Sequence, residues 1–340
     1  MDLSTPYLGL TLASPFMAGA SPLAGDLDTA RRLEDSGAAA IVLHSLFEEQ
    51  VTLETRGTIR HRDPHAAEFA AALAQFPAPR EYALTLDGYL AHISRLKAAL
   101  HVPVIASLNG TSKETWLQVA KNIEQAGADA LEVNIYDVVS DPGVSAMSLE
   151  TSLRDMVVEL KRALRLPIAL KLSPYYTAFG NLARRLDQAR VDGLVLFNRF
   201  YQADIDLASL TAAPHLELSS PSELRLRLQW TALLHKRVKT SLAVTGGVRT
   251  PDDGIKAVLA GADAVQVVSA VLQRGPRCFT ELRVGLSQFM EEREFASVSA
   301  MKGRVSFADM EDPAAFQRAS YIRTLQSWVR QRQSTIVTDQ

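Results

Sequence analysis

Several short apolar runs of this 340-residue chain contain or end in side chains that could do chemistry. Lys171 lies inside the run IALKLSP, where a buried ammonium is costly unless an anion offsets its charge. That anion could be a bound ligand, or it could be a carboxylate of the chain such as Glu132. Asp137 follows the run LEVNIY, where it could serve as an acid or base or simply cap a turn.

Three asparagines, Asn109, Asn134 and Asn198, also close apolar runs. Each amide offers both donors and an acceptor, so three of them at one edge of a sheet suit a flat polar ligand. Taken singly, each could equally cap a loop. His44 ends another run, and it could be a base, a ligand contact or a side chain satisfied by neighbouring backbone groups.

The run SLAVT is followed directly by Gly246 and Gly247, and a later run ends in Ser269 and Ala270. Glycines let backbone N–H groups approach an anion closely, although the pair could also make a tight turn between a strand and a helix. If these runs are the last two strands of a barrel, their loops are the usual phosphate site of that fold. We therefore predict a phosphate site here.

The runs alternate with helical patterns such as LDTARRLEDSG and ETWLQVAKNIEQAG. Most of the runs lack polar alternation, which is typical of strands covered on both faces. Eight repeats with helical crossovers predict an α/β fold, a TIM (β/α)₈ barrel, rather than a doubly wound sheet, and no GxGxxG fingerprint occurs. The predicted strands are Pro15–Ala20, Ala40–Leu46, Val102–Leu108, Ala130–Tyr136, Ile168–Leu172, Gly193–Phe197, Ser241–Thr245 and Ala264–Ala270.

Two segments are longer than a barrel requires, namely 47–86 after the second strand and 201–224 after the sixth. We predict that both form long loops over the C-terminal face, where barrel enzymes hold their sites. We divide the chain into a barrel, 1–293, and a helical extension, 294–340, that packs on the barrel or on a partner. The sequence AGADA occurs twice, and its glycine is predicted to end a helix in the left-handed conformation.

Composition narrows the function further. A net charge of -2 gives no bulk reason to bind nucleic acid or an anionic membrane, and nowhere do about twenty apolar residues run together. Cys278 is the only cysteine, and the histidines do not cluster at metal-ligand spacings, so we predict no disulfide within the chain and no metal site. We expect a cytoplasmic protein that acts on a small molecule.

These residues resemble the class 1 dihydroorotate dehydrogenases and their dihydropyrimidine dehydrogenase relatives. The resemblance runs in order through about residues 15 to 288. It rests on the segments PFMAGAS, ALEVNI, PIALKLSPY, LVLFN and VTGGVRTPDDGIKAVLAGADAVQVVSAVL, of which the last is the most specific.

The resemblance implies a barrel that binds FMN, with Lys171 facing the pyrimidine end of the flavin. It places the flavin phosphate on Gly246, Gly247, Ser269 and Ala270, and it places Ala20 and Ser21 beside the isoalloxazine ring. It also implies flavin contacts from His44, Ser45, Asn109 and Asn134, and substrate contacts from Asn134, Asn198 and Arg199.

The chain departs from the family where the substrate would bind. The family has an N-x-S-C-P-N motif whose cysteine removes a proton from the substrate, but this chain has Asp137 at the cysteine and Val139 at the later asparagine. His44 replaces the family's lysine after the second strand, and the Asn-bearing loop is not recognisable in FPAPREYALTL. We interpret Asp137 as the base, with Tyr136 and Ser140 as other candidates.

The leading hypothesis is an FMN-dependent oxidoreductase that moves a hydride between a CH–CH bond of a dihydropyrimidine-like substrate and flavin N5. Dihydroorotate is the default substrate. One alternative is a flavin-binding subunit without catalysis of its own, and another is a phosphate-binding lyase or isomerase in which Lys171 forms a Schiff base. The resemblance implies a homodimer, and the electron acceptor, including a redox partner protein, stays open.

Overall fold

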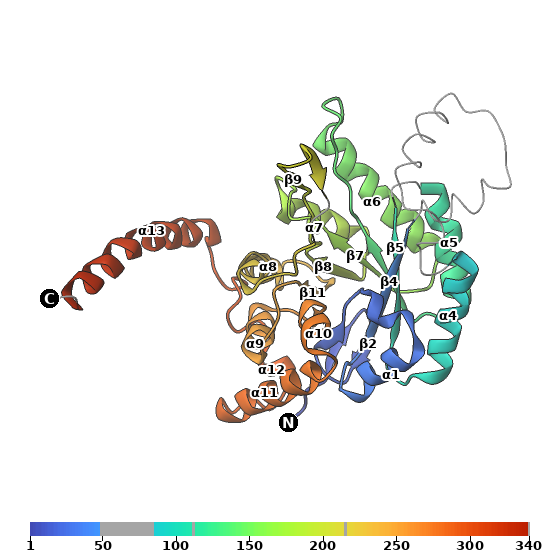
Figure 1. Cartoon of the computed structure of the whole chain (residues 1–340), viewed down its shortest axis with the longest axis horizontal. Coiled ribbons are helices and arrows are strands. Elements are labelled where there is room, and N and C mark those ends of the chain that lie inside the picture. The colour runs from blue at the N-terminus through green and yellow to red at the C-terminus, as the bar shows by residue number, and fades with distance from the viewer. Residues whose placement is uncertain (48–84, 111–112, 214–215, 339–340) are drawn as a thin grey trace.

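The centre of the molecule is a closed barrel of eight parallel strands in the order β11-β12-β3-β4-β5-β6-β7-β8. The structure, a computed structural model, describes residues 1–47, 85–110, 113–213 and 216–338 (Figure 1). The predicted TIM barrel is confirmed, and each barrel strand lies at its predicted run. The strands are β3 (Phe16–Ala18), β4 (Ile41–Phe47), β5 (Val104–Asn109), β6 (Ala130–Asn134), β7 (Ile168–Leu172), β8 (Gly193–Leu196), β11 (Ser241–Thr245) and β12 (Ala264–Val267).

Helices surround the barrel and bury one apolar face each against the strands (Figure 1). α10 (Ser269–Arg274) is a short helix directly after β12. The longer helices are α1 (Leu27–Asp35), α4 (Leu86–Ala99), α5 (Lys113–Gln125), α6 (Ala146–Ala163), α7 (Phe179–Gln188), α8 (Pro221–Leu234), α9 (Pro251–Ala260) and α11 (Cys278–Glu292).

The glycines that follow three of these helices have positive φ, namely Gly37 (99°), Gly127 (93°) and Gly261 (117°). This left-handed conformation costs glycine little because it has no Cβ. The prediction made from the repeated AGADA sequence is therefore confirmed. Each glycine turns the chain from the end of a helix toward the start of the next strand.

The amino-terminal end of the barrel interior is apolar. An antiparallel hairpin of β1 (Thr5–Tyr7) and β2 (Leu10–Leu12) packs there with small strand residues such as Ala130, Ala169 and Ala264. The small residues leave room for the larger Tyr7 and Leu8 of the hairpin. The sequence analysis did not predict this hairpin.

A polar layer lies two residues farther along the same strands. Because side chains alternate in a strand, the residues two positions after this apolar layer also face the barrel interior. They include Ser107, Glu132, Lys171, Thr245 and Gln266, all of them buried. The barrel therefore brings charged and amide side chains together just below the carboxyl ends of its strands.

The insertion predicted after the sixth strand is present. It contains an antiparallel hairpin of β9 (Asp204–Asp206) and β10 (Thr211–Ala213), which lies at the top of Figure 1, whereas the N-terminus lies at the bottom. The long loop predicted after the second strand falls almost entirely on residues 48–84, which lie outside the described residues.

The C-terminal region has two parts. The short helix α12 (Val298–Met301) packs on the barrel through fully buried Val298 and Met301. Helix α13 (Pro313–Thr338) points away from the barrel in Figure 1 and contains the predicted helical pattern SYIRTLQSWV. Within the described ranges of the chain, no helix has the length and apolar character needed to cross a membrane.

Candidate functional site

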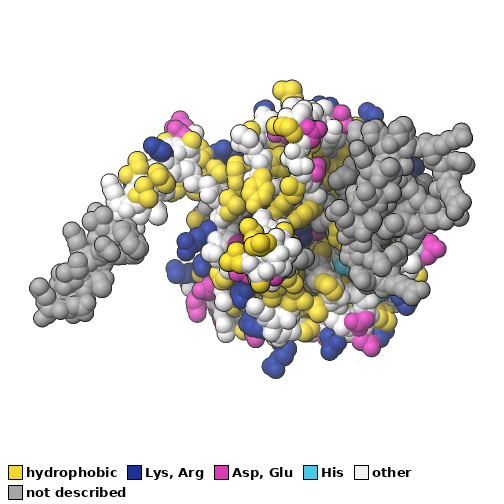
Figure 2. All heavy atoms as spheres, turned by 45° about the horizontal axis from the view of Figure 1, so that its top comes forward, with side chains coloured by type: hydrophobic (Ala, Val, Ile, Leu, Met, Phe, Trp, Pro, Cys, Tyr) yellow, Lys and Arg dark blue, Asp and Glu magenta, His cyan; other side chains and the backbone are white. Residues whose placement is uncertain are grey.

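Two cavities lie side by side at the carboxyl ends of the barrel strands. The first has a volume of about 610 Å³ and the second about 660 Å³, both within the usual range for small-molecule sites. Figure 2 turns the top of Figure 1 toward the viewer. Hydrophobic side chains gather in the middle of the face that it shows.

The first cavity collects most of the predicted site residues. Ala270 is not among its lining residues, because it lies buried in α10, and Asp137 lines the second cavity instead. The predicted residues that line the first cavity are Ala20, Ser21, His44, Ser45, Asn109, Asn134, Lys171, Asn198, Arg199, Gly246, Gly247 and Ser269.

Lys171 forms a buried cluster with Glu132 and Gln266. Its Nζ lies 3.4 Å from Glu132 Oε1 and 3.5 Å from Gln266 Oε1, and Gln266 Nε2 donates to Glu132 Oε2. The carboxylate partner considered from the sequence is thus present. Both Nζ contacts are longer than the usual charge-assisted hydrogen bond, and Lys171 also lines the first cavity. An ammonium carries three donors, so Lys171 can hold Glu132 below and bind a ligand above.

Among the described residues, three polar atoms around the first cavity are buried without a hydrogen-bond partner. They are His44 Nδ1, Asn134 Oδ1 and Arg199 Nη1. An unsatisfied buried polar group costs about 1 to 3 kcal/mol, so each of these atoms calls for a partner beyond those that the described part of the chain supplies. Two of these atoms belong to side chains that can donate and one is an amide acceptor, which suits a ligand with mixed polarity.

His44 is held neutral by its surroundings. Burial lowers the pKa of its imidazole below the usual value, and nearby His92 lowers it further. Its ring meets the edge of Tyr89 with the centroids 5.5 Å apart, and the Tyr89 hydroxyl donates to Ser107 O. A neutral imidazole has one donor and one acceptor nitrogen, so His44 can bind a ligand without adding charge.

The glycine pair after β11 makes a tight cradle beside α8. Gly246 and Gly247 have φ of 92° and 81°. A Cβ on Gly246 would lie 2.9 Å from the Arg227 guanidinium, and one on Gly247 would lie 2.7 Å from Leu224 N. Only glycine fits at either position, because the backbone here packs tightly against α8.

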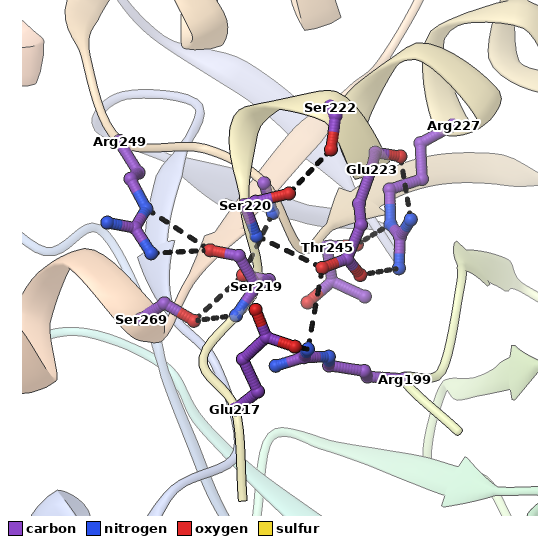
Figure 3. A network of polar contacts seen from close by, with 11 residues as sticks. Arg199, Glu217, Ser219, Ser220, Ser222, Glu223, Arg227, Thr245, Arg249 and Ser269 are labelled. Carbon is purple, nitrogen blue, oxygen red and sulfur yellow. Dashed lines mark hydrogen bonds and ion pairs between the residues drawn. The ribbon is translucent and has the colours of Figure 1, made fainter. Parts of the chain in front are cut away.

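Ser219 joins three loops at this cradle (Figure 3). Its Oγ accepts from Gly247 N–H at 3.1 Å and lies 2.8 Å from Ser269 Oγ, while Arg249 donates to its carbonyl. The adjacent α8 starts at Pro221 with a capping box between Ser220 and Glu223. Serine hydroxyls rotate to suit their partners, and a helix N-terminus favours anions, so this corner has the components of a phosphate site.

Arginines and carboxylates balance in the same network. Arg227 is buried and donates to Thr245 O and to Glu223 O, and Arg199 lies 3.6 Å from Glu223 and 3.8 Å from exposed Glu217. Arg249 donates to Ser219 O through its side chain and to the buried Asp253 carboxylate through its backbone N–H. Three guanidinium groups and three carboxylates thus meet at this corner.

Asn198 has a structural role in the barrel. Its Nδ2 donates to Ile135 O at 2.9 Å and to Lys171 O at 3.2 Å, which ties the ends of β6 and β7 together. Its amide nitrogen is thus occupied, as the loop-capping alternative expected, although the residue still lines the first cavity. Asn134 differs, because its Oδ1 has no partner among the residues that the structure describes.

An aromatic wall separates the two cavities. Tyr136 lines the first cavity and stacks on Phe200 of the second, with ring centroids 4.4 Å apart, and Tyr201 lines both. The Tyr136 hydroxyl accepts a hydrogen bond from Tyr201 N–H. Asp137 is exposed on the second-cavity side of this wall.

Sequence reasoning missed Ser219, Arg227 and Gln266. Gln266 had a signal, because an amide inside the apolar run AVQV is as unusual as Lys171 in its own run. The run SSPSE carried a capping-box pattern that marks the start of a helix at the site. Arg227 had no signal, because nothing in LRLRLQW distinguishes its buried arginine from the exposed Arg225.

Known proteins resemble this chain over most of its length. The dihydroorotate dehydrogenase family model matches residues 82–290, which is 209 of the 340 residues. The catalytic subunit of dihydroorotate dehydrogenase B (NAD(+)) from Thermoplasma volcanium is 27% identical over 316 residues, covering 89% of this chain and 98% of the relative. The corresponding subunit from Methanothermobacter thermautotrophicus is 28% identical over 310 residues, covering 88% and 97%.

A third relative is the NAD-dependent dihydropyrimidine dehydrogenase subunit PreA of Escherichia coli K12. It is 24% identical over 322 residues, covering 89% of this chain and 76% of the relative. The family model covers more than half of the chain. The chain therefore belongs to the dihydroorotate dehydrogenase family of flavin-dependent oxidoreductases that act on CH–CH groups.

Proposed function

We propose that this chain binds FMN in the first cavity and oxidises or reduces a CH–CH bond of a small cyclic amide, with dihydroorotate as the first compound to test. One observation carries the proposal: Lys171 and the Gly246–Gly247 cradle line the same cavity. A cation and an anion site in one cavity suit a flavin mononucleotide, which has a phosphate at one end and a ring that gains negative charge on reduction.

The residues present fit the cofactor. Gly246 and Gly247 line the first cavity where a Cβ would clash with Arg227 or Leu224, and the Ser219 and Ser269 hydroxyls bond each other beside them. At the ring end, Lys171 can donate to an anionic pyrimidine edge while Glu132 holds the ammonium in place. The unpaired Asn134 Oδ1 supplies an acceptor for a ring N–H.

FMN, when bound, accepts a hydride from one carbon of the substrate. The chain must then take a proton from the adjacent carbon, so that CH–CH becomes C=C with loss of one hydride and one proton. We propose the Asp137 carboxylate as the base that takes this proton. It stands at the family's cysteine position and lines the second cavity, across Tyr136 and Tyr201 from the first.

The electrons must then leave the chain. Cys278 is the only cysteine, so the chain itself cannot hold an iron–sulfur cluster on a set of cysteines. Relatives named as a catalytic subunit and as subunit PreA support a partner subunit as the acceptor. The predicted cytoplasmic homodimer stays a prediction.

The first experiment is an absorbance spectrum of the purified protein mixed with FMN and then freed of unbound flavin. We expect about one FMN per chain. Anaerobic addition of dihydroorotate then tests the reaction, because substrate oxidation bleaches the flavin bands. A protein that retains no FMN contradicts the proposal, whereas bound FMN that dihydroorotate leaves oxidised points to another substrate.

A further inference from the structure

The second cavity is built by the same strands as the first. β5 ends in Asn109 at the first cavity, and Gly110 follows at the second. The ends of β6, β7 and β8 show the same arrangement. At each of them, one residue lines the first cavity and a residue one or two positions later lines the second. The pairs are Asn134 with Ile135, Lys171 with Ser173, and Arg199 with Phe200. A ligand whose reacting group lies in the first cavity therefore has the second cavity directly beside it.

The second cavity is lined mainly by apolar and aromatic side chains. They come from the loops after β6, β7 and β8 and from α5 and α6, and they include Trp116, Val138, Leu149, Met156, Tyr176 and Phe200. Val138 and Val139 occupy this wall directly after Asp137. Removing an apolar group from water into such a space is favourable by about 25 cal/mol per Å².

Charge in the second cavity disfavours an anion. Among the described residues that line it, the charged side chains are Asp137 and Glu150, and none is a lysine or arginine. Glu150 is paired with Arg185 at 2.9 Å. Burial raises the pKa of the Tyr176 hydroxyl to about 12, and the Asp137 and Glu150 carboxylates add to this effect. The negative charges of Asp137 and Glu150 would likewise repel a substrate carboxylate, such as that of dihydroorotate, in the second cavity.

One buried donor in the second cavity also has no partner within the described parts of the chain. Trp116 is 2% exposed and lines the cavity, and its Nε1–H makes no hydrogen bond to any described residue. Indole N–H groups are usually paired when they are buried. A ligand atom that accepts a hydrogen bond would satisfy this group.

We propose that the second cavity binds an uncharged, apolar or aromatic substituent of the substrate, whose cyclic amide lies in the first cavity. The inference rests on the proposed function and narrows it. The substrate class becomes a hydrophobically substituted cyclic amide of the dihydropyrimidine type, and a small carboxylated pyrimidine leaves the second cavity unfilled.

The test is calorimetric binding of three oxidised ring compounds, uracil, orotate and 6-phenyluracil, to the purified protein loaded with FMN. We expect 6-phenyluracil to bind on the order of tenfold or more tightly than uracil, because its ring buries apolar surface in the second cavity. Orotate is expected to bind no more tightly than uracil. Orotate binding more tightly than 6-phenyluracil would overturn the inference.

Two tryptophan substitutions on α6 localise the effect. Ser152→Trp fills the second cavity, which Ser152 lines, and it is expected to bring the ratio of 6-phenyluracil to uracil affinity close to one. Ser148→Trp is the matched control, because Ser148 is an exposed serine one turn earlier that does not line the cavity, and it should keep the ratio. A ratio that survives Ser152→Trp contradicts the location.

Leu149→Ala gives a second measurement that needs no bulky side chain. Removing part of the apolar lining is expected to weaken 6-phenyluracil binding several-fold relative to uracil.

The FMN content of the protein distinguishes failure of the proposed function from failure of this inference. Protein that binds no FMN defeats the proposed function, whereas protein that binds FMN but shows no preference for 6-phenyluracil defeats only this inference.

Discussion

At the scale of single residues, the site combines buried side chains that lack partners with a few that hold one another. His44, Asn134 and Arg199 each have one buried polar atom at the first cavity that no described residue pairs with. Lys171, Glu132 and Gln266 instead form a closed cluster beneath it. The cluster fixes the ammonium at the floor of the cavity, while the unpaired atoms are available to a ligand.

Asp137→Asn tests the proposed base. The amide keeps the size of the side chain but cannot accept the proton, so turnover of the true substrate should fall about 100-fold to 10,000-fold while FMN content is unchanged. Stopped-flow measurement of flavin reduction provides the rate. Ser140→Ala tests a rival candidate for the base and is expected to retain the rate. Near-normal turnover in Asp137→Asn would mean that Asp137 only caps the turn and is not the base.

Lys171→Met tests the buried ion pair. It leaves the Glu132 carboxylate buried without its cation, so the free energy of unfolding should fall by about 3 to 5 kcal/mol. The double variant Glu132→Gln/Lys171→Met removes both charges and should recover most of the loss. Urea unfolding of the unaltered protein, the single variant and the double variant measures the free energy of unfolding of each. Equal stability of Lys171→Met and the unaltered protein would mean that the pair contributes little.

At the scale of elements, the site depends on loops that the barrel brings to one edge. The β11 loop supplies the glycine cradle, the start of α8 supplies Ser219 and Ser220, and the start of α10 supplies Ser269 (Figure 3). These loops are far apart in the sequence. They meet because parallel strands place all of their carboxyl ends on one face of the barrel.

Gly247→Ala tests the cradle against a matched glycine. Both Gly247 and Gly127 have positive φ, but a Cβ at Gly127 meets nothing within 4 Å, whereas one at Gly247 lies 2.7 Å from Leu224 N and 2.9 Å from Ser220 O. Gly127→Ala should therefore cost only the conformational strain, about 1 to 2 kcal/mol. Gly247→Ala should cost more and should also weaken FMN binding, because it displaces the start of α8.

Thermal melting and flavin titration of both variants measure these two effects. The result that contradicts the cradle is equal FMN affinity in Gly247→Ala and Gly127→Ala.

At the scale of the whole molecule, the two ends of the barrel interior differ in the kind of side chain that they bury. The amino-terminal end of the barrel is closed by the β1–β2 hairpin and small apolar residues, and the opposite end carries the polar layer and both cavities. One half of the barrel interior therefore stabilises the fold, while the other half holds side chains whose burial needs partners or a ligand.

Acid should destabilise the protein partly through two histidines. Burial lowers the pKa of both His44 and His235 below the usual value near 6.5, and Lys302 and Lys236 lower that of His235 further. The unfolded chain therefore binds protons at a higher pH than the folded chain does. Their contribution to stability is fully present above pH 6.5 or so and is lost as the pH falls through the lowered pKa values.

The measurement is urea unfolding at pH 7.5 and at pH 5.5. His235→Gln should reduce the loss of stability between the two pH values. His101→Gln is the control, because the side chain of His101 is 96% exposed, and it should leave that loss unchanged. A pH dependence that His235→Gln does not alter would assign the acid sensitivity to other groups.

The sequence by itself determined the barrel and most of the first cavity. Unbroken apolar runs separated by helical periodicity indicated buried parallel strands, and eight such runs favoured a closed barrel over a doubly wound sheet. Once the strands were placed, the residues at their ends had to share one face. Gly246, Gly247, Lys171 and Asn134 were therefore predictable as neighbours, because local pattern and fold topology together fix their position.

Only the tertiary structure decided which cavity each side chain faces. Asp137 follows Tyr136 directly, yet Tyr136 lines the first cavity and Asp137 lines the second, with Phe200 from another loop stacked on Tyr136. The ion pair of Lys171 with Glu132 and the buried guanidinium of Arg227 likewise depend on which strands and helices meet. Such contacts join residues far apart in the sequence, so no local periodicity encodes them.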